Sequence, residues 1–285
     1  MLETLINPKR AEKGPWKMFF IGIIYASLSL LLVKFFFSGD PVLIKYSGWI
    51  VVLFCVLFSL PFMYFIIRRE ERADEDVEGI KHVWIAHKDA MYAFMWLFLG
   101  FVIAFSFWLL ILQDSNLLNA QIETYCSINN PGNVASCVEQ YSTGTFLGPT
   151  GYATGMLKFA SILQNNLYVV AFTLIFSLIF GAGAIFILAW NATVIASAIG
   201  VFTRFELSQI PAGFLRYMLH GLPEITTYFL AALAGGMLGT GLMRNGFRSS
   251  KFVHVIQNSM ILLLLAIIIL VVAGLMEVYL TPLFF

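Results

Sequence analysis

The sequence predicts an all-α protein, a polytopic transmembrane helical bundle, and three observations support this fold class. The 285-residue chain is 60% hydrophobic and only 12% charged, whereas soluble domains carry roughly 25% charged residues. Several uncharged stretches approach the roughly 20 residues that a helix needs to cross a bilayer. These stretches are apolar on all sides, which is typical of helices buried in lipid or in a bundle. The formal net charge of +1 leaves no basic surplus of the kind that binds nucleic acid.

The apolar stretches predict about six to seven membrane segments. The expected spans are about 16–37, 47–67, 90–112, 167–190, 224–243 and 252–280. Residues 191–219 combine a short apolar piece, a polar break and Pro211, so this broken segment either crosses the membrane or re-enters it as a hairpin. We therefore expect an N-terminal three-span region, a polar loop and a C-terminal membrane domain, at residues 1–112, 113–166 and 167–285.

The distribution of Lys and Arg predicts the orientation of the chain, because cytoplasmic loops carry an excess of these residues. Most of them lie before residue 14, in the charged loop 68–89 and in the turn 244–251, whereas 113–166 contains only Lys158. The N-terminus and loop 68–89 are thus expected in the cytoplasm, and 113–166 outside it, in a cell membrane. The side of the C-terminus depends on whether 191–219 crosses or re-enters.

The cysteines agree with this orientation. Cys126 and Cys137 flank a turn-rich stretch of the outer loop, and disulfides persist in oxidising spaces. A bridge between them would add roughly 3 kcal/mol in the chain-entropy model; two free thiols are the alternative. Cys55 lies in an apolar span and is expected to be a buried thiol. A metal site at the pair is disfavoured because no histidine lies nearby.

No pattern typical of an enzyme is present. The sequence shows no Ser-His-Asp set, no glycine-rich phosphate loop and no Cys-x-x-Cys motif, so we expect no enzymatic activity, no catalytic residue, no bound metal and no cofactor. His82 and His87 are five residues apart, a poor match to the pair at i and i+4 that shares a helix face. The mixed charges of 68–89 predict a solvated helix.

A few polar residues inside the apolar spans are the candidate functional groups, since ionisable side chains at membrane depth are costly and mark functional sites. His220 and Glu224 are four residues apart, with Pro223 at the expected first helical turn. Glu224 then either complements the helix dipole there or forms with His220 a titratable pair lining a cavity. Glu277 is expected to pair with His220, His254 or an arginine.

Glycines also stand out within the apolar spans. They are Gly181, Gly183, Gly235, Gly236, Gly239 and Gly241. Small residues let helix backbones approach closely. This close approach serves packing within one chain or an interface between subunits, and the second interpretation predicts a homo-oligomer formed through the glycine-rich spans.

Four motifs in order carry a family resemblance. Gln164-Asn-Asn166 opens a span, a break runs from Asn191 to Gly200, His220-Gly-Leu-Pro-Glu224 precedes a glycine-rich span, and Glu277-Val-Tyr-Leu-Thr-Pro282 ends the last one. Over about residues 164–282 the chain resembles the stage II sporulation protein M family of integral membrane proteins. It departs from the family's frequent Asn-Gly where it has Asn191-Ala192. The candidate positions are Asn166, Asn191, His220, Glu224 and Glu277.

The resemblance implies a membrane protein with no established catalytic residue. Bacterial relatives take part in membrane migration and cell-wall remodelling during engulfment, as membrane partners of peptidoglycan-degrading proteins. Members also occur in organisms that form no spores, including archaea, so a sporulation role does not follow for this chain.

Two function classes remain. The first is an oligomeric channel or permease-like pore for small ions or solutes, in which segment 191–219 and the candidate polar residues line the path, because irregular backbone at membrane depth is tolerated where it lines water. The second is a non-transporting scaffold for envelope or membrane remodelling, which recruits protein partners through 113–166 or 68–89. An accessible polar site favours the pore, and a paired, dry one favours the scaffold.

Overall fold

The computed structural model describes residues 14–74, 80–129, 132–143, 155–180, 184–203, 207–246 and 248–284. These residues form helices and turns, and they contain no strand. Six of the described helices are long and apolar enough to cross a membrane. The prediction of an all-α polytopic bundle is therefore confirmed, and the chain is a multi-pass membrane protein.

The long helices follow the expected spans closely in the N-terminal part and less closely after it. They are α3 (Lys17–Phe36), α4 (Ser47–Asp74), α5 (Ile80–Leu112), α8 (Gly155–Phe180), α9 (Ala184–Phe202), α10 (Ile210–Asn245) and α11 (Ser250–Leu275). Two shorter helices, α6 (Asn119–Asn129) and α7 (Val134–Thr143), lie between α5 and α8. After α11 the chain continues as a π-helical segment, Met276–Leu280, and a short 3₁₀ turn, Thr281–Leu283.

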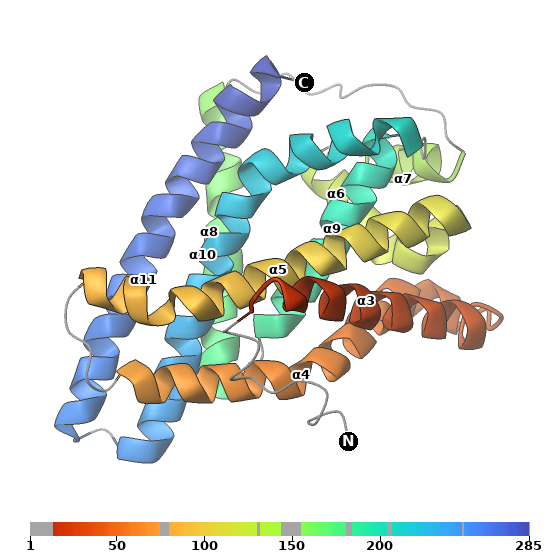
Figure 1. The fold of residues 1–285 in the computed structure, drawn as a ribbon. Coiled ribbons are helices and arrows are strands. Elements are labelled where there is room, and N and C mark those ends of the chain that lie inside the picture. Colours follow the sequence, from red (N-terminus) through yellow and green to blue (C-terminus); the bar gives the residue numbers. More distant parts are fainter. Residues whose placement is uncertain are drawn as a thin grey trace.

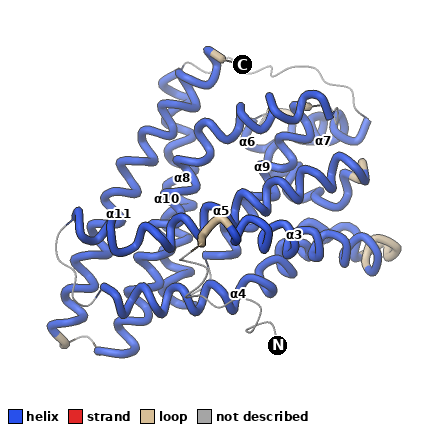
Figure 2. Tube along the Cα trace, in the orientation of Figure 1, coloured by secondary structure: helices blue, strands red, loops and turns tan. Residues whose placement is uncertain are grey.

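Helix α10 lies at the centre of the fold. In the apolar stretch of α10 that could span a membrane, 78% is buried inside the protein, compared with 22% for α8 and 33% for α11. In Figure 1, α8 and α11 flank α10, while α3, α4 and α5 lie together and α9 lies between the two groups. In Figure 2 the described residues are drawn as helices with short turns. The C-terminal segment ends beside the start of α8, where the Tyr279 ring lies against Gly155.

The fourth span differs from the expectation. Instead of one helix over 167–190 with a break at Asn191, α8 begins at Gly155, within the expected polar loop, and α9 runs through Asn191. Helix α8 ends at Phe180 and α9 begins at Ala184, and residues 181–183, with Gly181 and Gly183, lie outside the described residues. Asn191 does not break the helix because its side-chain Nδ2 donates to the Ile187 carbonyl at 2.7 Å, and this bond satisfies the amide inside α9.

Glycines bring α8 and α10 into backbone contact. A Cβ atom added at Gly235 would collide with the Leu174 carbonyl oxygen, and one added at Gly239 would collide with the Leu178 carbonyl oxygen. These two glycines therefore serve packing within the chain, which is the first of the two interpretations of the glycine-rich span. Gly22 and Gly100 form an equally close contact between α3 and α5, which the sequence analysis did not single out.

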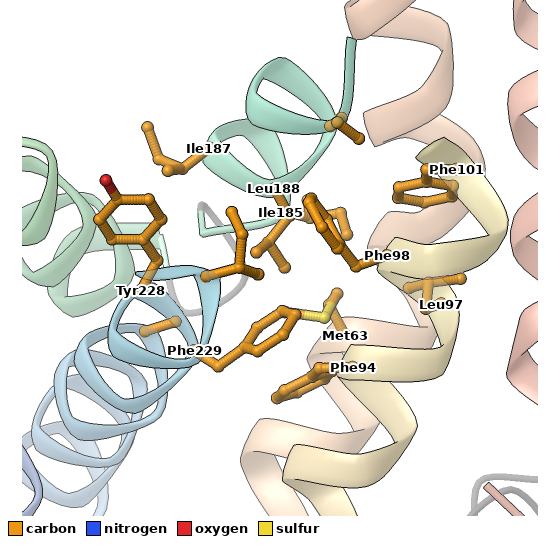
Figure 3. Packing of buried hydrophobic residues seen from close by; sticks show 14 of the residues in the cluster. Met63, Phe94, Leu97, Phe98, Phe101, Ile185, Ile187, Leu188, Tyr228 and Phe229 are labelled. Atoms are coloured by element: carbon orange, nitrogen blue, oxygen red, sulfur yellow. The ribbon is translucent and has the colours of Figure 1, made fainter. Parts of the chain in front are cut away.

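An aromatic cluster joins α10 to α5. The Phe229 ring lies 5.5 Å from the Phe94 ring and 6.4 Å from the Phe98 ring, centroid to centroid. Met63 and Ile185 border the same cluster (Figure 3). The neighbouring residue, Tyr228, lies on the other side of α10, with its hydroxyl pointing away from the phenylalanines (Figure 3). One face of α10 is thereby fixed by aromatic packing, and the Tyr228 face is left for polar contacts.

The cysteine predictions are confirmed. Cys126 and Cys137 form a disulfide that links α6 to α7, and Cys55 is a buried free thiol. Loop 68–89 differs in part from the expected solvated helix, because the Glu70 Oε2 and His87 Nδ1 atoms lie 2.6 Å apart in a buried contact between α4 and α5. The side chain of His82 lies outside the described part of the structure.

We predict that Gly235→Leu destabilises the folded protein by about 1–3 kcal/mol, because the added side chain overpacks the α8–α10 contact. The gain in helix propensity, up to about 1 kcal/mol, offsets only part of this cost. Thermal unfolding in detergent, followed by circular dichroism, measures the change. Gly39→Leu is the matched control, since a Cβ at Gly39 meets nothing within 4 Å. Equal melting temperatures for the two variants would contradict the assigned contact.

Candidate functional site

The site begins on α10, where His220 and Glu224 lie one turn apart and so share a helix face. The helix starts at Ile210 and runs through Pro223, so Pro223 is not at its first turn and Glu224 is not an N-terminal cap. The prediction that Pro223 lies in the first helical turn, with Glu224 complementing the helix dipole, is therefore wrong. Proline lacks an N–H and its ring crowds the preceding turn, which bends a helix. Figure 1 shows α10 changing direction before it runs alongside α8.

The carboxylate of Glu224 has hydrogen-bond partners from two helices. The Tyr228 hydroxyl, one turn further along α10, donates to Glu224 Oε1 at 2.6 Å. The Asn166 side chain of α8 also hydrogen-bonds to the Glu224 carboxylate. The oxygen of the Asn166 amide accepts a hydrogen bond from Asn165 Nδ2 at 3.2 Å. A chain of hydrogen bonds therefore runs from the outer side of α8 to Tyr228.

A second carboxylate, Glu277, lies close enough to Glu224 for the two charges to interact. It sits in the π-helical segment Met276–Leu280 that follows α11. Such segments are rare and occur frequently at functional sites. Lys158, at the start of α8, interacts electrostatically with Glu277. Three stretches of chain thus contribute charged groups to one place.

His220 occupies the other end of this polar cluster. Its Nδ1 atom lies 3.1 Å from the Thr281 hydroxyl oxygen, which itself donates to the Met276 carbonyl at 3.1 Å. The positive charges of Lys158 and Arg216 act on the imidazole. His220 is therefore tied to the C-terminal segment through Thr281 rather than bonded directly to Glu224.

The helix register sets the depth of the site. Asn166 contacts Glu224, and further along the two helices Leu174 contacts Gly235, so α8 and α10 run parallel. The α8 span covers Gly155–Ile179, and Asn166 is one residue from its middle position. A span of this length, about 37 Å, exceeds the hydrocarbon thickness of about 30 Å. Glu224 therefore lies at membrane depth, away from both ends of α8.

The site places two carboxylates close together. Asn166 is buried, while Glu224, Glu277 and His220 are half-buried. Two partly buried carboxylates close together repel each other, and a positive group beside them lowers the cost. Lys158 supplies one positive group. Among the described residues, no three His, Cys, Asp or Glu side chains gather in a way that could hold a metal ion.

The structure brings together four of the five candidate residues. Asn166, His220, Glu224 and Glu277 share the site, whereas Asn191 hydrogen-bonds within α9. The expected partner of Glu277 was His220, His254 or an arginine, but its electrostatic contact is with Lys158. Three site residues escaped the sequence analysis. Tyr228 could have been found from its spacing of four from Glu224, whereas Lys158 and Thr281 reach the site only through tertiary packing.

Comparison with known proteins gives one match. The family model described as stage II sporulation protein M matches residues 93–282. The matched segment includes the whole site and begins inside α5, well before residue 164, where the motif resemblance starts. No curated protein and no solved structure matches this chain.

We predict that Tyr228→Phe lowers the free energy of unfolding by about 1–2 kcal/mol, because Glu224 Oε1 loses its hydroxyl donor inside the bundle. Denaturant or thermal unfolding in detergent measures this change. Tyr92→Phe is the control, because Tyr92 is exposed on α5. A Tyr228→Phe variant as stable as the control would show that the hydrogen bond contributes nothing to the fold.

Proposed function

We propose that the chain, which belongs to the stage II sporulation protein M family, forms a path for small ions or solutes across the membrane. Glu224 and Glu277 are the central polar groups of this path, and His220 and Asn166 border it. The observation that carries the proposal is the half-buried carboxylate of Glu224 at membrane depth, with the half-buried carboxylate of Glu277 close to it. Ionisable residues at this depth almost always face a bundle interior or a water-filled cavity.

The backbone around the site also supports a path. The kinked helix α10, with Pro223 inside it, and the π-helical segment Met276–Leu280 both depart from regular α-helix beside the carboxylates. Irregular backbone at membrane depth is tolerated where it is buried in protein or lines water.

A second candidate function is a non-transporting scaffold, and one observation favours it. The hydrogen bond from Asn166 of α8 to Glu224 of α10 joins these two helices, and the bond from Tyr228 holds the Glu224 carboxylate in place. In a scaffold the site would be dry, and partner proteins would bind elsewhere. The lobe formed by α6 and α7 within 113–166 is the proposed surface for such partners, and loop 68–89 is the other.

The proposed orientation places the N-terminus and loop 68–89 in the cytoplasm and the α6–α7 lobe outside. The Lys and Arg distribution supports it. The Cys126–Cys137 disulfide within the lobe supports it as well, because disulfides persist in oxidising compartments and are rare in the cytosol.

Flux through purified protein in liposomes tests the path. We expect wild-type protein to dissipate at least one gradient of Na⁺, K⁺, H⁺ or Cl⁻, and we expect Glu224→Gln and His220→Ala to change that flux. Loss of a hydrogen-bonded charge worth about 1.5–3 kcal/mol corresponds to roughly a tenfold change or more in rate. Ion-selective electrodes and a pH-sensitive dye give the rates.

Glu123→Gln is the control for a general loss of charge, because Glu123 is exposed on α6. Each variant is checked for intact folding by gel filtration before reconstitution. If folded wild-type protein dissipates none of the four gradients, the path is wrong for these ions. If the chain is instead a non-transporting scaffold, we expect Glu224→Gln to alter assembly or stability and not flux.

A further inference from the structure

Helix α8 carries a polar face that turns away from its own bundle. Ser161, Gln164, Asn165 and Tyr168 are all exposed. Their spacing of i, i+3, i+4 and i+7 places them on one side of the helix. We call these four residues the α8 polar face. Lys158 precedes them by about one turn and interacts with Glu277 of its own chain.

The opposite side of α8 makes the contacts within the chain. Asn166, Val170, Thr173 and Ser177 are buried, and this is the side that meets the glycines of α10. The α8 polar face therefore has no described helix of its own chain packed over it. It is an outer surface of the bundle.

Lipid is a poor neighbour for such a surface. Asn165 lies two positions before Leu167, the middle residue of the span Gly155–Ile179, so the polar face extends into the hydrocarbon layer. Polar groups without hydrogen-bond partners there cost several kcal/mol each. Within the chain, Gln164 Nε2 donates to the Tyr168 hydroxyl at 3.1 Å and Asn165 Nδ2 donates to Asn166. These two bonds use only part of the capacity of the amides.

The outward faces of α3 and of the middle of α11 differ from that of α8. The exposed residues in the middle of α11 are Met260, Leu264, Ile267, Ile268 and Val272, and α3 exposes Phe20, Ile24 and Leu28. These surfaces suit lipid. Among the described spans, α8 thus combines the smallest buried share with a polar outward side at membrane depth.

We propose that the α8 polar face is an interface with a second copy of this chain inside the membrane. Side-chain amides and hydroxyls both donate and accept hydrogen bonds, so the same surface on two copies related by a two-fold axis is self-complementary. Ser, Asn and Gln hydrogen-bond across membrane helices in this way. The glycines of α10 do not supply the interface, because Gly235 and Gly239 contact α8 of the same chain.

The interface adjoins the polar site. Asn165 of the α8 polar face donates to Asn166, which hydrogen-bonds to Glu224. Contact between two copies therefore positions the Asn166 amide and the helix on which it lies. The proposal does not depend on transport, since a scaffold with the same bundle would present the same face.

Cysteine cross-linking tests the interface in native membranes. The chain is well suited to it, because Cys126 and Cys137 are bridged and Cys55 is buried. We expect Ser161→Cys and Asn165→Cys to give disulfide-linked dimers after oxidation with copper phenanthroline, seen on non-reducing gels. Leu264→Cys and Ile267→Cys on α11 are the matched controls. Both control positions are exposed, and we expect them to remain monomeric.

Three results would overturn the proposal. The first is the absence of dimers at both α8 positions in folded protein. The second is dimer formation at the α11 positions to the same extent, which indicates random collision. The third is rapid modification of the uncross-linked α8 cysteines by a charged methanethiosulfonate reagent, which indicates a water-lined surface of a single copy. These experiments measure cross-linking and thiol modification and do not measure flux. The proposed interface can therefore fail while the proposed path holds, and the reverse.

Discussion

Lipid offers no hydrogen-bond partner to a carboxylate, so Glu224 must find its partners inside the bundle. The arrangement of three chain segments meets this constraint. Tyr228 on the same helix and Asn166 on α8 both hydrogen-bond to Glu224, and the C-terminal segment brings Glu277 to the same place. An unpaired charge at this depth would cost several kcal/mol, which exceeds the contribution of most single contacts in the fold.

Backbone contacts between helices make these polar contacts geometrically possible. Gly235 and Gly239 let α10 approach the α8 carbonyl groups, which holds Asn166 within reach of Glu224. The aromatic rings of Phe94, Phe98 and Phe229 fix the opposite side of α10. Small residues and large rings on two faces of one helix thus set its position and rotation. The positions of the polar groups follow from this packing.

The site could be predicted from the sequence only where polar residues interrupt apolar runs. Asn166, His220, Glu224 and Glu277 stand out in this way and do lie together. Asn191 stands out equally but bonds within its own helix, since an amide can be satisfied locally without any site. Helix ends were less predictable, because membrane bundles tolerate features that end helices in water; α10 runs through Pro223. The buried Glu70–His87 contact lies in a mixed-charge stretch, where composition indicates exposure.

The central claim is that the polar site formed by Glu224 and Glu277 is hydrated, and thiol accessibility tests it most directly. The measurement is the rate at which a charged methanethiosulfonate reagent modifies the Glu277→Cys variant in proteoliposomes. The native buried thiol Cys55 is the internal standard for a dry position. The account predicts clear modification at position 277 and none at Cys55 in folded protein. A cysteine at position 277 that is as unreactive as Cys55 would contradict a hydrated site. The non-transporting scaffold, in which the site is dry, would then be the remaining function.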